Sequence, residues 1–347
     1  MVKDRVLRFV GIEGVAVAFA FVVMVVVFSI ASPFFLTGGN LRNLFVESVF
    51  VILLAAGMTY VLVIGGIDLS VGSVLGLSAG TTLLALMSGA PTAVGILVGI
   101  GTGFLVGLLN GALIAGLGIN DFIVTLGTLS IGAGALQVMT QKTQLTGVDN
   151  AAFAALTKSS VLGLPTPVLI MLVILVLLEL VLVGTPFGRS LYAAGINGRA
   201  AYLAGVSVRR LRLQVYVLSG VVTGCAGVLL ASHLNSVQPG LAAGYELTAI
   251  AAAVLGGISL AGGRGSVWRS VVGALFLSTL SQGLQLLGVS SLWFSIVTGA
   301  SIIAAVALDR GLGRLVAAGL RASAPSERPT SSPTPLVERP APVSTQA

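Results

Sequence analysis

Long apolar runs alternate with short polar breaks along almost the whole chain. The runs Val15–Ala31 and Val168–Leu178 contain no charged residue, and with their flanks each reaches the roughly 20 residues that a helix needs to cross a bilayer. This pattern predicts an all-α polytopic membrane protein with about ten transmembrane helices. The predicted segments run approximately over Val15–Ala31, Leu44–Ile64, Val71–Met87, Thr92–Ala115, Phe122–Thr140, Pro167–Val183, Gln214–Ser232, Leu247–Leu260, Val267–Leu287 and Leu292–Leu308.

The composition fits a membrane protein and not a soluble one. Of the 347 residues, 56% are hydrophobic and 8% are charged, whereas soluble domains carry about 25% charged residues. The first apolar run is longer than the core of about 7–15 residues in a secretory signal, and Ser29–Pro33 makes a poor cleavage site. We therefore expect the first helix to be retained.

Basic residues gather in loops that a cytoplasmic N-terminus would place inside the cell. Only Arg42, Lys142 and Lys158 then fall outside. This asymmetry follows the positive-inside rule, so the net charge of +7 requires no nucleic acid partner. We expect a protein of the cell (inner or plasma) membrane with both termini cytoplasmic. The inner basic residues are Lys3, Arg5, Arg8, Arg189, Arg199, Arg209, Arg210, Arg212, Arg264, Arg269, Arg310, Arg314 and Arg321.

The chain divides into one membrane domain and a short tail. Residues 1–322 form the predicted transmembrane domain, which includes an inner loop at 184–213. Residues 323–347 are rich in Pro, Ser and Thr and contain too little apolar surface to fold, so we expect a disordered cytoplasmic end.

Glycines recur every four residues along the fourth predicted span. Such positions form a stripe on one side of a helix, and glycine there lets a second backbone approach closely. The first span has no glycine between Val15 and Ala31 and is rich in Val and Phe. We therefore expect a peripheral first helix beside a closely packed core. The stripe consists of Gly95, Gly99, Gly103, Gly107 and Gly111.

An acidic residue interrupts the apolar pattern between the second and third spans, inside the sequence GGIDLSVG. A spanning helix cannot run undisturbed through Gly65, Gly66, Asp68, Ser70 and Gly72. Asp68 can cap the third helix by accepting amide hydrogens, which we favour, or it can form a gate or coupling contact. A near-repeat of this motif, Gly256-Gly257-Ile258-Ser259-Leu260, predicts two related halves of a transporter.

Neutral polar side chains stand in or near several apolar helices. They can form interhelical hydrogen bonds or line a path for a neutral polyhydroxylated solute, and the sequence leaves both readings open. Two of them, three residues apart, share a helix face. Glu47 lies near a span end, and we expect His233 to be an interfacial residue at an outer helix end. The candidate path residues are Asn110, Gln137, Asn235, Gln282 and Gln285.

The sequence gives no sign of chemistry carried out by the chain itself. It contains no Walker A loop, no cluster of Cys and His, no catalytic constellation and no acidic residue near a predicted bilayer midplane. These absences disfavour a membrane enzyme and an ion-coupled carrier, so transport would draw energy from elsewhere or be passive. The inner loop at 184–213 is either an interfacial helix on anionic lipid headgroups or a docking element for a cytoplasmic partner.

Four segments of the chain resemble one known family. The segments are Gly57–Gly72 with its GGIDLSVG core, Phe122–Ser130, Pro186–Gly205 and Tyr245–Trp268. Together with Leu286–Asp309 they resemble, in the expected order, the permease subunits of ribose-type ABC sugar importers.

The resemblance implies a ten-helix permease of the type II ABC importer kind. Such a permease works in a pair, as a homodimer or heterodimer, with cytoplasmic ABC ATPase subunits and an extracytoplasmic sugar-binding protein. ATP would be bound by the partner subunit, so no cofactor is expected on this chain. Imported solutes would be monosaccharides or similar small polar molecules, and a self-contained carrier or channel is the alternative. The coupling-loop residues carried over by the resemblance are Gly188, Arg189, Gly195, Asn197 and Ala200.

The sequence departs from the family pattern at two places. Asn120 and Asp121 precede Phe122 where the family usually has two prolines. In the coupling loop, Ile196 stands where a glycine is common, and Gly198-Arg199 replaces a proline and an acidic residue. The missing acidic charge bears on which ATPase fits the loop.

Overall fold

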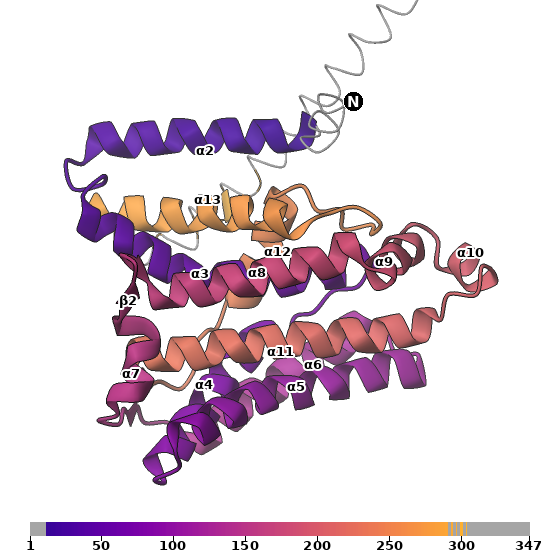
Figure 1. Cartoon of the computed structure of the whole chain (residues 1–347), viewed down its shortest axis with the longest axis horizontal. Coiled ribbons are helices and arrows are strands. Elements are labelled where there is room, and N and C mark those ends of the chain that lie inside the picture. The colour runs from indigo at the N-terminus through magenta and orange to yellow at the C-terminus, as the bar shows by residue number, and fades with distance from the viewer. Residues whose placement is uncertain (1–11, 291–292, 294–295, 297–298, 301–302, 304–347) are drawn as a thin grey trace, which may run out of the picture.

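The fold is a bundle of long helices that lie side by side (Figure 1). The computed structural model describes residues 12–290 together with 293, 296, 299–300 and 303. In chain order, the first seven elements are α2 (Ile12–Ala31), α3 (Gly38–Val63), α4 (Val71–Met87), α5 (Thr92–Leu117), α6 (Asp121–Met139), β1 (Leu145–Thr146) and α7 (Ala151–Lys158). The others are β2 (Ser160–Val161), β3 (Leu164–Pro165), α8 (Thr166–Gly184), α9 (Pro186–Ile196), α10 (Gly198–Leu203), α11 (Val208–Leu234), β4 (Ser236–Val237), α12 (Tyr245–Leu255) and α13 (Val267–Leu286).

Five helices of the described region are long and apolar enough to cross a membrane, namely α3, α5, α6, α8 and α11. Val17–Ala31, α4 and α12 are shorter apolar helices. Nine of the ten predicted segments correspond to helices of the structure, while Leu292–Leu308 and the tail at 323–347 lie largely or wholly outside the described residues. The count of ten spans therefore stays a prediction.

Three predicted helix ends were wrong. The helix expected from Leu44 begins at Gly38, directly after its N-cap Thr37. The helix expected over Leu247–Leu260 ends at Leu255, because the chain turns through Gly257, whose φ of +83° suits glycine. The helix expected from Gln214 begins at Val208, so the arginines of the inner loop form the first turns of α11. The segment between α8 and α11 is therefore shorter than the predicted loop.

Helix α3 forms the centre of the bundle. From Ser48 to Val63 its residues are buried, apart from the half-buried Val51, and it packs against α8, α11, α12 and α13. The hydroxyl of Tyr60 donates to the backbone carbonyl of Leu178 and ties α3 to α8. A helix that is apolar on all sides belongs in the interior of a large bundle, which agrees with this position.

The glycine stripe of α5 is a packing seam, as predicted. A Cβ on Gly103 would lie 2.2 Å from the carbonyl oxygen of Gly220, and one on Gly107 would lie 2.4 Å from that of Tyr216. Both partners belong to α11, so the two helix backbones are in direct contact. The seam fixes α11 against α5 and thereby orients the polar residues of α11.

The first helix is peripheral, which was also expected. Figure 1 shows α2 at the edge of the bundle beside α13. Phe28 of α2 packs closely on α13 at Gly283. A Cβ added to Gly283 would lie 2.3 Å from the nearest carbon of the Phe28 ring. Most of the described side chains of α2 are otherwise exposed or half-buried.

Short connections differ between the two ends of the bundle. At one end lie α7, the hairpin of β2 and β3, and the antiparallel pair of β1 and β4; at the other lie α9 and α10 (Figure 1). Because α9 and α10 follow α8 and precede α11, they connect two long antiparallel helices at that second end. Two candidate functional regions lie at these opposite ends.

Candidate functional site

The GGIDLSVG segment forms a compact turn between α3 and α4. Gly65 has a φ of +80°, and a Cβ on Gly66 would lie 2.8 Å from the hydroxyl of Tyr216. A Cβ on Gly72 would lie 2.0 Å from a carboxylate oxygen of Glu246. The glycines of the motif therefore admit neighbouring helices and a turn that side chains would block.

Asp68 is the final acceptor of a buried chain of hydrogen bonds. Thr128 donates to Asn110 over 2.6 Å, Asn110 donates to Ser70 over 2.9 Å, and Ser70 donates to Asp68 over 2.6 Å. Asp68 also accepts the backbone amide of Ser70 at 3.0 Å and the hydroxyl of Ser219 at 3.3 Å. This network joins α4, α5, α6 and α11 around a carboxyl that is 3% exposed.

The capping role expected for Asp68 is partly met in the structure. Asp68 does accept a free amide just before α4, but the N-cap residue is Ser70, and its side chain makes no capping bond. A second role of Asp68, as a gate or coupling contact, stays a prediction.

A second carboxylate holds the same turn from another helix. Asp121, at the start of α6, accepts the amide of Ile67 at 2.7 Å and the hydroxyl of Tyr216 at 3.4 Å. Asn120 caps α6 through the amide of Phe122 at 3.0 Å. The two residues that replace the expected proline pair therefore have defined structural roles here.

The two related glycine motifs meet each other at the end of α9. Gly65, the first glycine of one motif, and Gly257, the second glycine of the other, both have φ values near +80°. The amide of Gly263 donates to the carbonyl of Val63 over 2.8 Å, and a Cβ on Gly195 would lie 1.9 Å from the same carbonyl oxygen. The backbone of α9 therefore contacts the end of α3, just before the first motif, and the loop that follows the second motif.

Most of the predicted coupling-loop residues shape the α9–α10 hairpin. Gly188 packs its backbone on Leu182, and Asn197 caps α10 by accepting the amide of Ala200 at 3.0 Å. Arg189 has an exposed side chain. The exposed face also carries Ile196, Tyr202 and Leu203, which are 74%, 70% and 78% exposed.

Tyr192 fastens α9 to the loop that follows α12. Its hydroxyl donates to the carbonyl of Gly265 over 2.6 Å. Burial and the Glu179 carboxylate raise the pKa of Tyr192 to about 12, against a smaller lowering by Arg269. The phenol therefore stays protonated near neutral pH and remains a donor.

A polar cavity of about 640 Å³ lies at the opposite end of the bundle. Asn43 and Glu47 of α3, His233 of α11 and Tyr245 of α12 line one part of it. The remainder is lined mainly by α13, which contributes Ser278, Ser281, Gln282 and Gln285. Four helices of a single chain therefore meet around one polar space.

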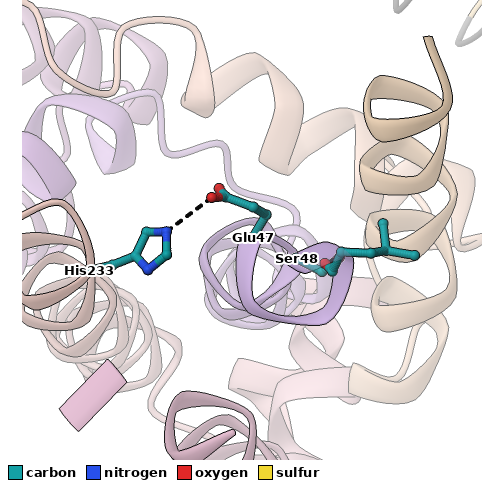
Figure 2. A network of polar contacts seen from close by, with 4 residues as sticks. Glu47, Ser48 and His233 are labelled. Carbon is teal, nitrogen blue, oxygen red and sulfur yellow. Dashed lines mark hydrogen bonds and ion pairs between the residues drawn. The ribbon is translucent and has the colours of Figure 1, made fainter. Parts of the chain in front are cut away.

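A hydrogen-bonded pair of side chains lines this cavity. Nε2 of His233 and Oε1 of Glu47 are 3.0 Å apart, and the two side chains are 27% and 52% exposed. Figure 2 shows Glu47 extending from α3 toward His233, while Ser48 points to the other side of the helix. From the sequence, His233 is expected to be an interfacial residue, and its partner Glu47 is not evident. The two residues are far apart in the sequence, and the local sequence does not determine which neighbouring helix a side chain faces.

The predicted path residues are not all in one place. Gln282 and Gln285 share the cavity, and the amide of Gln282 donates to Asn40 over 2.8 Å. Asn110 is committed to the buried network, Asn235 caps α11 with a φ of +47°, and Gln137 is exposed on α6. The latter three therefore have interhelical, capping or surface positions in this structure.

Comparisons with known proteins place most of the chain in one family. Residues 40–306 match the family described as branched-chain amino acid transport system, permease component. The chain is 41% identical over 289 residues to the ribose import permease protein RbsC of Bacillus subtilis (strain 168), a match that covers 83% of this chain and 90% of that protein.

Two further relatives are named for other sugars. The D-allose transport system permease protein AlsC of Escherichia coli (strain K12) is 35% identical, over 84% of this chain and 90% of its own length. The L-arabinose transport system permease protein AraH of the same strain is 38% identical, over 86% of this chain and 90% of its own length. No solved structure matches the chain.

Proposed function

The chain belongs to this family of transport-system permease components, and on that premise we propose that it is the membrane subunit of an ABC sugar importer. It translocates a monosaccharide or similar small polar solute across the cell membrane into the cytoplasm. ATP hydrolysis in a partner subunit drives the transport, and the chain itself is not an enzyme. The observation that carries this proposal is similarity to sugar permeases over more than four-fifths of the chain.

The names of the relatives support a sugar as the solute. They include import proteins for ribose, allose and arabinose, each at 35% identity or more. The polar cavity agrees with a neutral polar solute, because amides and hydroxyls supply most of its polar groups. An extracytoplasmic binding protein would deliver the solute to the end of the bundle that holds the cavity.

The α9–α10 hairpin supports docking of an ATPase. It presents Ile196, Tyr202 and Leu203 on an exposed face, with Arg189 and Arg199 also exposed. Exposed apolar groups next to arginines are typical of protein interfaces. Through Gly195 the hairpin also contacts Val63 at the end of α3 and Gly263 in the loop after α12, so an ATPase bound there would act on the ends of α3 and α12.

Reconstitution into liposomes tests the proposal. Vesicles would contain the full chain with or without its ATPase partner and binding protein, with ATP on the ATPase side, and uptake of radiolabelled D-ribose, D-allose and L-arabinose would be measured. We expect concentrative uptake of at least one sugar only when ATPase, binding protein and ATP are all present.

Two results would contradict the proposal. Full uptake without the ATPase would identify a self-contained carrier or channel. Failure of the complete system to accumulate any of the three sugars, with ATPase binding intact, would remove the assigned solute class. The exposed hairpin gives an internal control, because replacing Leu203 with Ser should weaken ATPase binding in pull-down assays without unfolding the chain.

A further inference from the structure

The cavity between α3, α11, α12 and α13 has the size of a ligand site. Its volume of about 640 Å³ falls within the range of about 300–1,000 Å³ found for small-molecule pockets. A monosaccharide is small compared with the ligands of such pockets, so bridging waters could accompany it. The residues that line it belong to α3, α11, α12 and α13, so four helices of each copy enclose one such space.

The lining supplies the groups that recognise sugar hydroxyls. A hydroxyl both donates and accepts hydrogen bonds, and the side chains of Gln282, Gln285, Ser278 and Ser281 can do the same. Tyr245 adds an aromatic face on which the C–H side of a sugar ring can pack. The mixture of amides, hydroxyls and one ring thus matches a polyhydroxylated ring.

Some of these groups have no hydrogen-bond partner within the part of the chain that the structure describes. The hydroxyl oxygen of Ser278 is buried and makes no hydrogen bond among the described residues. A buried hydroxyl without a partner destabilises a fold unless water or a ligand pairs with it. The side-chain amide of Gln285 also makes no hydrogen bond in the described part of the chain, and the oxygen of Gln282 stays available because its nitrogen bonds Asn40.

The charge of the cavity favours a neutral solute. Glu47 and His233 are the two lining residues in the described region that can carry charge, and they pair with each other at 3.0 Å. A phosphorylated sugar would meet the Glu47 carboxylate without a lysine or arginine to offset it. The carboxylate oxygen that does not face His233 can accept a sugar hydroxyl, a strong type of hydrogen bond.

We infer that this cavity is a binding site for one neutral monosaccharide in each chain. Gln285 bonds its hydroxyls, the Ser278 hydroxyl does so once its side chain rotates from its buried position into the cavity, and Glu47, held by His233, accepts a further hydroxyl. The inference rests on the proposed function and adds where in the chain the sugar is held and how many sugars are bound per chain.

Binding measurements on the full chain in lipid nanodiscs test this inference. Equilibrium dialysis with radiolabelled D-ribose, D-allose and L-arabinose would give affinity and stoichiometry for the wild type, Ser278→Ala and Gln285→Ala. Loss of a single neutral hydrogen bond should weaken binding of the preferred sugar by about three- to tenfold. Ser278→Ala should fold normally, because it removes an unpaired hydroxyl.

Ser78→Ala is the matched control. Ser78 lies in α4 away from the cavity, and its buried hydroxyl is likewise without a hydrogen-bond partner in the described region. It should bind sugar as tightly as the wild type. Thermal melting of all variants would show that altered binding does not reflect unfolding.

The outcomes separate this inference from the proposed function. Saturation at one sugar per chain, with weaker binding in Ser278→Ala and Gln285→Ala alone, supports it. Saturation at one sugar per two chains, unchanged binding in both variants, or no binding of any of the three sugars at tens of millimolar would each overturn it. The ATP-dependent uptake assay could still succeed in all three cases, whereas its failure would remove the proposed function.

Discussion

Gly195 and Val63 are packed backbone to backbone, so that a Cβ added to Gly195 would lie 1.9 Å from the Val63 carbonyl oxygen. The same carbonyl accepts the amide of Gly263 at 2.8 Å. One peptide group at the end of α3 therefore touches both the exposed hairpin and the loop of the second glycine motif. A rigid three-way backbone contact of this kind can pass motion from a docked partner into the bundle.

Replacing Gly195 with Ala should separate α9 from the end of α3. The added carbon meets backbone atoms that cannot rotate away, so we expect a loss of about 1–3 kcal/mol of stability. ATP-driven uptake should fall roughly two- to thirtyfold, the range of measured coupling changes. Uptake in reconstituted vesicles and thermal melting would measure the two effects.

Gly198→Ala is the control in the same hairpin. A Cβ on Gly198 has nothing within 4 Å, so this variant should retain stability and uptake. Equal uptake by the two alanine variants would show that the contact of Gly195 with Val63 does not transmit the action of the ATPase.

Ser70 stands in the middle of the hydrogen-bond chain that ends at Asp68. Replacing it with Ala removes the acceptor of the Asn110 amide and one donor of the buried Asp68 carboxyl. Leaving buried polar groups unpaired costs about 1–3 kcal/mol, so we expect a lower melting temperature in detergent.

Ser88→Ala provides the comparison at the other end of α4. Its hydroxyl is exposed and donates to Ala85 over 2.7 Å, so water can replace the lost bond and stability should change little. If Ser70→Ala melted at the same temperature as Ser88→Ala, the buried network would contribute nothing measurable to the fold.

Substitutions at two glycines of α5 distinguish the effect of helix packing on stability from the effect of helix propensity. A Cβ on Gly103 would lie 2.2 Å from Gly220 of α11, whereas one on Gly101 has open space around it. Gly103→Ala should destabilise the protein by about 1–3 kcal/mol through overpacking. Gly101→Ala should stabilise it by up to about 1 kcal/mol, because alanine favours helix more than glycine does.

Unfolding in detergent, followed for both variants, would check this pair. Similar stability for Gly101→Ala and Gly103→Ala would mean that α5 and α11 can move apart without cost. That result would contradict a tightly packed seam.

The helices and the seam could be predicted from the sequence because their signals are local. The bounds of α4, Val71–Met87, agree with the prediction residue for residue. The four-residue spacing of glycines in α5 identified the seam without reference to its partner. Only the structure shows that the partner is α11, because its matching positions, Gly220 and Gly224, lie over 100 residues further on.

The polar candidates could be predicted less completely. Gln282 and Gln285 share a helix face by spacing alone, and the structure places both at the cavity. Asn110 looked the same in sequence but faces the buried network, since helix orientation is set by tertiary packing. The pairing of Glu47 with His233 joins residues 186 positions apart, and no local pattern carries that information.

The bond from Tyr192 to Gly265 holds α9 against the loop after α12. Its hydroxyl donates over 2.6 Å, and a neutral hydrogen bond of this kind contributes about 0.5–1.5 kcal/mol. Tyr192→Phe removes only this hydroxyl. We therefore expect it to be less stable than the wild type by that amount at pH 8, where the phenol is protonated.

The deficit of Tyr192→Phe should shrink at alkaline pH. Burial and the Glu179 carboxylate raise the pKa of Tyr192 from 10.0 to about 12 in the folded protein. The unfolded chain thus loses this proton first, so the contribution is intact below pH 10 and is lost as the pH approaches 12. Unfolding in detergent from pH 8 to 11.5 would measure the difference, with Tyr202→Phe, at an exposed phenol, expected to match the wild type at pH 8. A deficit that stayed constant across this range would exclude a raised pKa.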